Sequence, residues 1–478
     1  MSKITEKIRA AVLSKNFLPV IFGFFIIQAL VYATIIGFNI PSDEQYHFSS
    51  IQYYAEQPVV NGPFTSDQNP ETIKDVRAID RNPSYLFHYL LSFPVRLFNA
   101  LHLSQHTQVL LLRYINILFA AASLYLVKKI FDRLSRDKLL KNLALAFFTL
   151  TGAVVWLAAS INYDNLANLL WTSFVLLGLR FIRSPDLTKL LVMIILVLLT
   201  PITKATFLPF IAVGFAVVLL IAALKRKQKN LSLLKLKIKW NYKLILLAGF
   251  TVLAGFLFVE RIGVNLAAYQ AVSPKCQQFF SLQQCATNNV YNRNIAQALR
   301  YSEEDKRQLI KHWDPFSHTG LWIYKMYNSL PWHLGHKRIE SNNYSEVAAW
   351  LLGGLALMTA LFSRRKFSFS RGYIFVLFLT ALYLSGVFLY NLNTYFSVGQ
   401  MYAYQGRYLL PVLPFVFLFV ATLALNSYRN MNPAAKKLFA LLWLIILPAY
   451  IVSHFTPLVF TVGGDSSWFS EYVIETTP

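Results

Sequence analysis

Long apolar stretches alternate with short polar ones along most of the chain, and this pattern predicts helices that cross a membrane. Such a helix needs about 20 predominantly apolar residues. The pattern predicts about eleven spans, at residues 17–40, 107–127, 142–160, 165–182, 187–200, 205–224, 244–263, 347–363, 372–391, 408–426 and 438–459. The fifth is short and runs into Pro201, so it either breaks there or continues beyond the proline.

One further apolar segment, residues 84–101, does not fit the pattern of a span. It carries His88, Pro94 and Arg96, and counting it would disturb the alternation of basic loops described next. A helix with a mixed polar and aromatic face is typical of the membrane interface. We therefore expect an interfacial helix in the first outer loop.

Basic residues gather in every second loop between the predicted spans. Lys and Arg collect in short cytoplasmic loops and so orient the helices. The clusters lie before residue 17 and within 128–141, 180–189, 225–243, 364–371 and 429–437. This alternation predicts a cytoplasmic amino terminus in the plasma membrane, with the two long loops, 41–106 and 264–346, outside.

These loops divide the chain into three parts. Residues 1–263 form an amino-terminal transmembrane module that includes the loop 41–106, residues 264–346 form an extracytoplasmic loop, and residues 347–478 form a carboxyl-terminal transmembrane module with an outer tail. Both cysteines, Cys276 and Cys285, fall in the second loop. An oxidising compartment permits a disulfide there, and two free buried thiols are the alternative.

The composition agrees with an all-α polytopic membrane protein. The chain has 478 residues, of which 56% are hydrophobic and only 14% are charged, which excludes a lone water-soluble domain. Its net charge of +23 is explained by the cytoplasmic loops, so we expect no nucleic-acid partner. No nucleotide-binding glycine motif is found, no cofactor is indicated, and a divalent cation is left open.

Ionisable and polar residues recur at the outer ends of four predicted spans. A charge near the hydrocarbon is costly and usually faces a cavity, a partner or a substrate. We expect these groups to meet in one pocket that opens to the outside. The candidates are Asp43, Glu44 and His47 after the first span, Asp164 at the fourth, Lys204 before the sixth, and Gln405, Arg407 and Tyr408 at the tenth.

Several of these candidates also have simpler interpretations. Asp43 and His47 are four residues apart and share a helix face, which suits acid–base or metal-ligand chemistry. Asp43, Glu44 and Asp164 are equally suited to stabilising the first turn of a helix. Lys204 suits a lipid phosphate or the interface, whereas the guanidinium of Arg407 binds phosphate in a bidentate way.

The order of these features resembles the C-type glycosyltransferase superfamily of integral membrane enzymes. The resemblance is carried by PSDEQYHF at 41–48, RNPSYLFHYLL at 81–91 and LLRYINILF at 111–119. More narrowly, PSDEQYH, NYD at 162–164, TK at 203–204 and QGRYLLP at 405–411 are similar to a bacterial family known mainly as predicted membrane proteins. The resemblance spans most of the chain but covers the 264–346 loop poorly.

The superfamily resemblance implies transfer of a sugar from a polyprenyl-phosphate-linked donor to a glycan, lipid or protein acceptor on the extracytoplasmic face, in cell-envelope assembly. Asp43 would be the catalytic base or would orient an acceptor hydroxyl, with Glu44 in reserve, and a single inverting displacement needs only one base. Arg407 and Lys204 would hold the donor phosphate. Asp164 would position the sugar or a divalent ion.

Two other functions fit the same sequence less well. An O-antigen-type polymerase or ligase also joins lipid-linked sugars outside the membrane. A transporter or flippase for a lipid-linked glycan is expected to show inverted repeats or paired broken helices, and the sequence shows neither.

Overall fold

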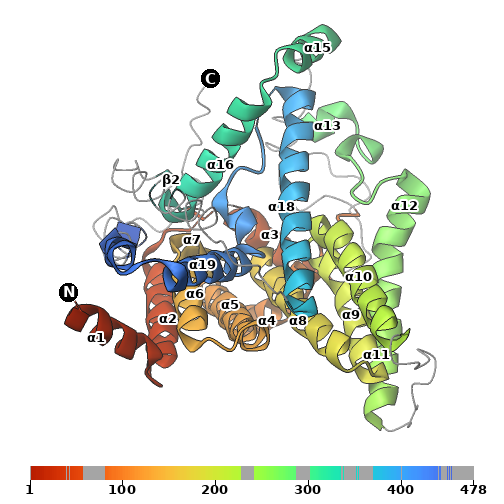
Figure 1. The fold of residues 1–478 in the computed structure, drawn as a ribbon. Helices are drawn as coiled ribbons and strands as arrows, with labels where there is room; N and C mark the ends of the chain where they lie inside the picture. The colour runs from red at the N-terminus through yellow and green to blue at the C-terminus, as the bar shows by residue number, and fades with distance from the viewer. Residues whose placement is uncertain are drawn as a thin grey trace.

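The computed structural model describes residues 2–57 except 39 and 42, and then 81–227, 242–286, 302–334, 337–338, 370–399 and 401–439, together with residues 351, 354, 441–442, 449–450, 452 and 454 (Figure 1). The predicted spans at 347–363 and 438–459 lie largely outside these residues. The described chain is almost entirely helical, as the sequence predicts.

The amino-terminal part is a succession of helices. These are α1 (Ser2–Leu13), α2 (Phe17–Ile35), α3 (Glu44–Glu56), α4 (Leu86–Ala100), α5 (Gln105–Leu134), α6 (Lys138–Thr149), α7 (Gly152–Ala158), α8 (Tyr163–Arg183), α9 (Leu187–Thr203), the 3-10 turn η2 (Ala205–Phe207), α10 (Leu208–Lys227), α11 (Tyr242–Phe258), the π-helical turn η3 (Val259–Gly263) and α12 (Val264–Tyr269).

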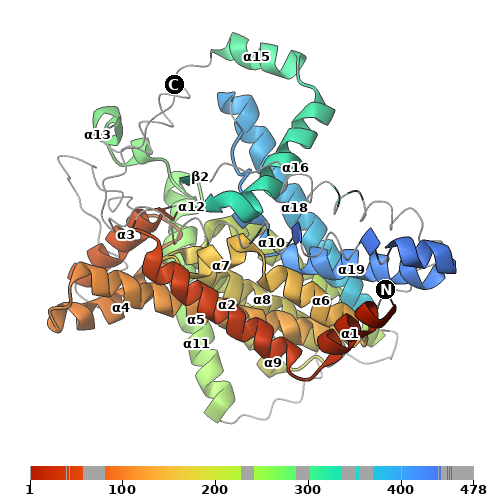
Figure 2. The same cartoon turned by 90° about the vertical axis from the view of Figure 1, so that its left-hand side faces the viewer.

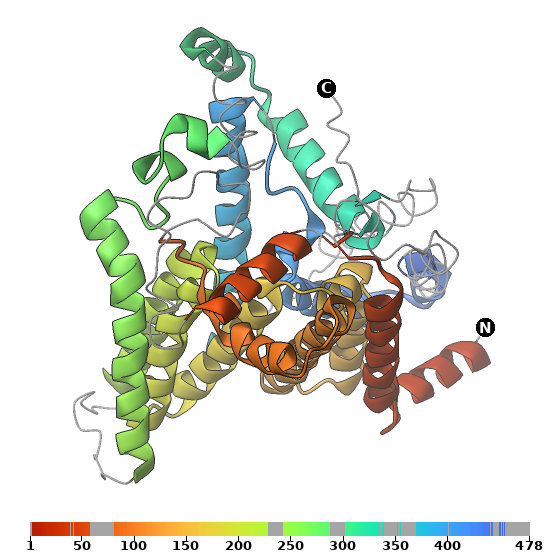
Figure 3. The same cartoon turned by 180° about the vertical axis from the view of Figure 1, so that it is seen from behind.

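The rest of the described chain contains shorter elements and two long helices. They are η4 (Cys276–Gln278), α13 (Leu282–Ala286), α15 (Glu303–Lys311), α16 (Pro315–Trp332), α18 (Arg371–Val398), η5 (Gly406–Leu409) and α19 (Leu413–Asn430). A two-residue antiparallel pair, β1 (His333–Leu334) with β2 (Lys337–Arg338), follows α16. In all three overall views α13, α15 and α16 lie toward the same end of the molecule as the upper end of α18 (Figures 1, 2 and 3).

Within the described part of the chain, six helices are long and apolar enough to cross a membrane, or seven if the pair α6 and α7 counts as one span. The six are Phe17–Ile35, Gln105–Leu134, Tyr163–Arg183, Ala205–Lys225, Tyr242–Tyr269 and Arg371–Ser397. Each matches a predicted span within a few residues at most ends. The full count of eleven is not confirmed, because α9 is shorter, α19 is not among the six, and two predicted spans lie largely outside the described residues.

The predicted span 142–160 is broken rather than continuous. The axes of α6 and α7 meet at 59°, and the Thr151 hydroxyl between them donates to the carbonyl of Phe147 at 2.8 Å. A Cβ on Gly152 would come within 3.3 Å of the Pro331 carbonyl, so the break lets the end of α16 approach the backbone. By contrast α9 continues through Pro201 to Thr203.

The helix α8 lies at the centre of the bundle, and α11 lies at its edge. In their most apolar windows 67% of α8 is buried, against 11% of the helix that continues from α11 into α12. Trp171 and Phe174 of α8 are fully buried, whereas Phe250 and Leu253 of α11 are exposed. Such an exposed apolar face is expected where lipid replaces protein as the neighbour. Figure 3 shows α11 and α12 as one long helix on the outside of the bundle.

The structure confirms a separate helix in the first predicted loop and a disulfide in the second, and the position of both loops outside the membrane stays a prediction. The segment 84–101 forms α4, a 15-residue helix that is too short to span and packs beside α3 at one end of α2 (Figure 2). Cys276 and Cys285 form a disulfide, so the open alternative of two free thiols is wrong.

A fully buried ion pair joins the start of α3 to α5. Arg113 donates to both carboxylate oxygens of Glu44, at 2.8 and 2.6 Å, and neither side chain is exposed. The same guanidinium donates to the carbonyls of Ala33 and Ile36 at the end of α2. The backbone N–H of Ile161 donates to Glu44 at 3.0 Å. We call this set the Arg113 clamp, and it fixes where α2, α3, α5 and the entry to α8 meet.

Glu44→Ala should destabilise the protein strongly. The change leaves Arg113 charged and buried, and removing one partner of a buried pair costs about 3–5 kcal/mol. Denaturant unfolding in detergent micelles, followed by circular dichroism, measures the loss. Asp132→Ala is the control, because its pairs with Lys128 and Lys141 are partly exposed and should contribute at most about 1 kcal/mol. Equal stability of the two variants would contradict a structural role for Glu44.

Candidate functional site

Asp43 and Arg407 form an ion pair although 364 positions separate them in the sequence. The Nη2 of Arg407 donates to Oδ2 of Asp43 at 2.9 Å. The Arg407 side chain is 9% exposed and that of Asp43 is 46% exposed. The pair therefore has a buried cationic side and an open acidic side, so a ligand can reach it past the carboxylate.

Asp43 occupies the N-cap position of α3 but does not act as a cap. Its backbone is left-handed, with φ 65°, and its side chain makes no capping hydrogen bond. Few residues other than glycine adopt this conformation, although Asp tolerates it better than most. Strained backbone of this kind clusters at functional sites. The capping interpretation therefore fails for Asp43, whose carboxylate bonds Arg407 instead.

A second ion pair joins Asp164 to Lys204, and both side chains are more than 90% buried. Asp164 lies in the first turn of α8, but Asn162 is the cap, because its Oδ1 accepts the N–H of Asp164 at 2.9 Å. Lys204 follows α9 in extended backbone. It does not snorkel to the surface, since its ammonium is held by a buried carboxylate.

Tyr408 connects the two ion pairs. The Lys204 ammonium lies 5.4 Å from the centre of the Tyr408 ring and 5.1 Å from that of Tyr163, and the guanidinium carbon of Arg407 lies 5.3 Å from the Tyr408 ring. Each distance is within the range of a cation–π contact. The predicted residues Asp43, Asp164, Lys204, Arg407 and Tyr408 therefore share one site.

The turn that carries Arg407 is held by its backbone. The N–H of Gly406 donates to Ser329 of α16, and a Cβ at Gly406 would come within 2.8 Å of the Met326 carbonyl. The glycine thus permits close contact with α16. Gln405 precedes this turn as its N-cap residue, and its carbonyl accepts the N–H of Tyr408 at 3.0 Å. The Gln405 side chain is half-buried, and its predicted contact with substrate stays a prediction.

His47, on α3, is fully buried and bonds a second histidine. Its Nδ1 lies 2.8 Å from Nε2 of His88 on α4, and its ring centre lies 4.6 Å from that of Tyr163. Burial lowers the pKa of His47 well below its ordinary value, and His88, Arg407 and Lys204 lower it further. Burial also lowers the pKa of His88, to about 3. Both rings are therefore neutral at physiological pH.

The charge on Arg407 is secure. Burial alone lowers its pKa, whereas Tyr408 and Asp43 raise it, and the net result lies above the ordinary value for arginine. Its Nε has no hydrogen-bond partner among the described residues. The site thus contains a permanently charged, buried donor that is not fully satisfied, which is the property expected of an anion-binding group.

Glu44 does not join this group. Its two oxygens bond Arg113 and the backbone of Ile161, and the side chain is fully buried. A carboxylate held in this way positions Asp43, the next residue in the chain. The geometry thus gives a structural role to a residue that the sequence suggested as a reserve base.

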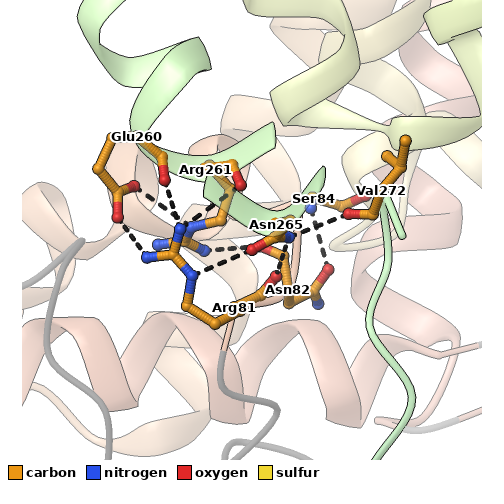
Figure 4. Close-up of polar contacts among 7 residues, drawn as sticks. All are labelled: Arg81, Asn82, Ser84, Glu260, Arg261, Asn265 and Val272. Carbon is orange, nitrogen blue, oxygen red and sulfur yellow. Dashed lines mark hydrogen bonds and ion pairs between the residues drawn. The ribbon is translucent and has the colours of Figure 1, made fainter. Parts of the chain in front are cut away.

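A polar cluster outside the site holds the backbone that leads into α4, the helix that carries His88 (Figure 4). Arg81 forms an ion pair with Glu260 of the π-helical turn η3 and donates to Asn265 of α12 at 3.0 Å. Arg261 donates to the Asn82 carbonyl at 2.6 Å. The cluster fixes residues 81–84 against η3 and α12. These four residues lead into α4.

Two side chains in this stretch contact the site elements. The Asn82 amide donates to the Tyr46 hydroxyl at 2.7 Å, and the Tyr46 ring lies edge-on to His88. The N–H of Ala205, next to Lys204, donates to the Ser84 hydroxyl at 3.0 Å. The stretch 81–84 therefore reaches both the histidines, through Tyr46, and the backbone next to Lys204.

Three residues near the site were not predicted from the sequence as site residues. Arg113 and His88 were visible only as polar residues inside apolar stretches, and Tyr163 as part of the NYD motif. A polar side chain inside an apolar stretch is the sequence feature from which these three residues could have been predicted. Among the described residues no group of three or more His, Cys, Asp and Glu side chains is arranged to hold a metal ion.

Together, the fold and the ionisable groups held between its apolar helices define a multi-pass α-helical membrane protein. Residues 25–291, more than half of the chain, match a family described as "Predicted membrane protein (DUF2142)", and the chain belongs to this family. The resemblance to a family of predicted membrane proteins is thereby confirmed at the level of the family, whereas its motifs stay predictions, and QGRYLLP at 405–411 lies outside the matched residues. No curated protein matches the chain.

Among solved structures, the chain is similar to the archaeal oligosaccharyltransferase AglB from Archaeoglobus fulgidus, in complex with an inhibitory peptide and a dolichol-phosphate. The identity is 11% and the TM-score is 0.42. The similarity covers 94% of this chain and 56% of that one, so this chain spans little more than half of that protein's length.

Acid should destabilise the protein through the two buried histidines. Below the ordinary histidine pKa of about 6.5 the unfolded chain takes up protons that folded His47 and His88 refuse. Their contribution is complete above that pH and is lost as the pH falls toward about 3, where folded His88 protonates. At pH 5 the loss from His88 is about 2 kcal/mol, and His47 adds to it in the same direction.

Thermal unfolding in detergent at pH 7.5 and pH 5 measures this loss. The wild type should lose more stability on acidification than the double variant His47→Gln, His88→Gln. The exposed residue His312 supplies the control His312→Gln, which should behave as the wild type. An identical acid response in the double variant would show that the pair does not titrate as argued.

Proposed function

We propose that this protein is a membrane glycosyltransferase that moves a sugar from a polyprenyl-phosphate-linked donor to an acceptor hydroxyl on the extracytoplasmic face. The observation that carries the proposal is the meeting of Asp43 and Arg407 beside the Asp164–Lys204 pair. A base and a phosphate-binding cation are the two groups that such a displacement needs, and here they come from opposite ends of the chain.

The electrostatics of the site suit a lipid phosphate. Arg407 offers an unpartnered Nε and stays charged, and the ammonium of Lys204 lies 5.4 Å from the centre of the Tyr408 ring, which Arg407 also contacts. Two cations at a site flanked by apolar helices stabilise an anionic leaving group more strongly than water does. Phosphate charge grows as the glycosidic bond breaks, so this stabilisation is greater in the transition state than in the ground state.

The proposed step is a single inverting displacement. The acceptor oxygen attacks the anomeric carbon from the face opposite the phosphate, its proton passes to Asp43, and the bond from the anomeric carbon to the phosphate oxygen breaks. The bonding electrons leave with polyprenyl phosphate, which Arg407 and Lys204 hold. Asp43 is half-exposed, so an acceptor can approach it, and Asp164 keeps Lys204 in place.

Other parts of the proposal follow from the sequence pattern. The positive loops place the site outside the plasma membrane, where the acceptor is a glycan, lipid or protein of the cell envelope. Gln405 and His47 are proposed to contact the substrate. We assign Glu44 to positioning rather than to base catalysis, because the Arg113 clamp occupies its oxygens.

Asp43→Asn should abolish transfer and leave the fold intact. The amide keeps the shape and still accepts a hydrogen bond from Arg407, but it cannot take a proton, and loss of a general base lowers the rate by about 10²–10⁴-fold. Proteoliposomes containing the protein, a panel of polyprenyl-phosphate hexoses and an envelope extract as acceptor are followed by ³¹P NMR. Conversion of phosphodiester to phosphomonoester measures transfer.

Asp132→Asn, on the surface at the far end of α5, is the matched control and should retain wild-type turnover. Wild-type turnover by Asp43→Asn would remove Asp43 from catalysis. If the wild type moves the lipid-linked sugar between leaflets without cleaving the phosphodiester, the protein is a flippase and the proposal fails.

A further inference from the structure

A chain of hydrogen bonds runs from the backbone through two buried histidines. The His88 ring bonds the backbone of Ser84 in a way that favours the protonated ring, which is the effect of an accepting carbonyl. Its Nε2 lies 2.8 Å from Nδ1 of His47, and the two rings are nearly parallel, at 20°. Because Nε2 faces His47, Nδ1 is left to bond Ser84.

This chain of hydrogen bonds fixes the tautomer of each histidine ring. A carbonyl only accepts, so neutral His88 carries its proton on Nδ1 and presents a lone pair on Nε2. His47 must then donate through Nδ1, which leaves the lone pair of its own Nε2 unused. Burial keeps both rings neutral, so neither nitrogen gains a second proton at physiological pH.

The Nε2 of His47 is buried and has no hydrogen-bond partner among the described residues. Buried polar atoms are normally paired, and an unpaired one in a native structure needs an explanation. Arg407 Nε is in the same state. The site thus has one unused hydrogen-bond acceptor, His47 Nε2, and one unused charged donor, Arg407 Nε. The two atoms would bind different chemical groups of a ligand.

These two atoms lie at the same site. Tyr163 contacts the His47 ring at 4.6 Å and the Lys204 ammonium at 5.1 Å. Asp43, the partner of Arg407, is one turn before His47, and its carbonyl accepts the His47 N–H at 3.0 Å. Histidine, lysine and arginine therefore surround the same few residues of α3 and α8.

The two unused atoms define a class of ligand. An ionised phosphate diester has no proton to donate, so it is repelled by a lone pair and attracted by a guanidinium. A neutral hydroxyl has the proton that a lone pair needs. A molecule that satisfies both carries an anionic phosphate close to a hydroxyl, as a sugar phosphate ester does.

We propose that His47 accepts, through Nε2, a hydrogen bond from a sugar hydroxyl of the phosphate-linked donor, and that His88 sets this polarity as a positioning residue. The proposal rests on the proposed function for the identity of the donor. It makes His47 the group that distinguishes a sugar-bearing lipid phosphate from the bare lipid phosphate, which Arg407 recognises without it.

Histidine-selective ¹⁵N NMR of the protein in nanodiscs tests the polarity without any need for turnover. The His47 signal is assigned by its loss in His47→Phe. The Nε2 of His47 should have the ¹⁵N chemical shift of an unprotonated nitrogen. In His88→Phe the ring of His47 should instead be a mixture of both tautomers. A proton on Nε2 of His47 in the wild type would overturn the proposal.

Ligand titrations in the same sample test the contact. Polyprenyl-phosphate hexoses should move the His47 Nε2 signal, whereas polyprenyl phosphate alone should not. His47→Phe, which keeps an aromatic ring against Tyr163, should weaken binding of the sugar-bearing lipid by about tenfold and leave polyprenyl phosphate within twofold. His47→Gln, which keeps an acceptor, should recover part of the loss.

The controls separate this proposal from the proposed function. His312→Gln should bind both lipids as the wild type does. If His47→Phe binds both lipids equally weakly, the role of His47 is purely structural. If it binds both lipids as tightly as the wild type does, His47 does not contact the donor. Absence of transfer by the wild type would overturn the glycosyltransferase assignment, while the tautomer and titration results would still decide the role of His47.

Discussion

The structure depends on one buried charge pair, that between Glu44 and Arg113. Two ions removed from water are tolerated only when their hydrogen bonds are satisfied, and here the carbonyls at the end of α2 and the N–H of Ile161 complete the set. Because the pair joins three helices, it fixes the start of α3. Asp43 directly precedes Glu44, so its position relative to the rest of the bundle follows from this interaction.

The site is assembled from helix ends rather than from any continuous motif. Asp43 precedes α3, Asp164 opens α8, Lys204 follows α9, and Arg407 lies in a short turn before α19. Helix ends carry unsatisfied backbone groups and lie near the edge of the apolar bundle, which is where charged side chains are least costly. The turn with Arg407 has no long helix to hold it, and it is fixed by backbone contacts to α16.

Much of the fold could be predicted because long apolar stretches are compatible with few structures other than membrane-spanning helices. The helix α8 lies close to its predicted limits, α2 and α5 begin near theirs but end elsewhere, and α4 was predicted as a separate helix from its polar residues. The break between α6 and α7 lies where α16, which is distant in the sequence, approaches the backbone of Gly152, and a contact between such distant segments could not be predicted. The sequence predicted that Asp43, Asp164, Lys204 and Arg407 meet, but it did not predict which of them pair, and it assigned no role to Arg113. Glu44 and Asp43 are neighbours in sequence, yet one bonds Arg113 and the other Arg407, and only tertiary packing separates their roles.

The central claim is that Arg407 binds a lipid phosphate in competition with Asp43. The most direct test is the affinity for polyprenyl phosphate of the wild type, Arg407→Gln and Asp43→Asn in nanodiscs, with the exposed Arg429→Gln as a control. Arg407→Gln should bind about 10–100-fold more weakly, whereas Asp43→Asn, which removes the negative charge beside the guanidinium but keeps the hydrogen bond, should bind at least as tightly as the wild type. Wild-type affinity in Arg407→Gln would contradict the account.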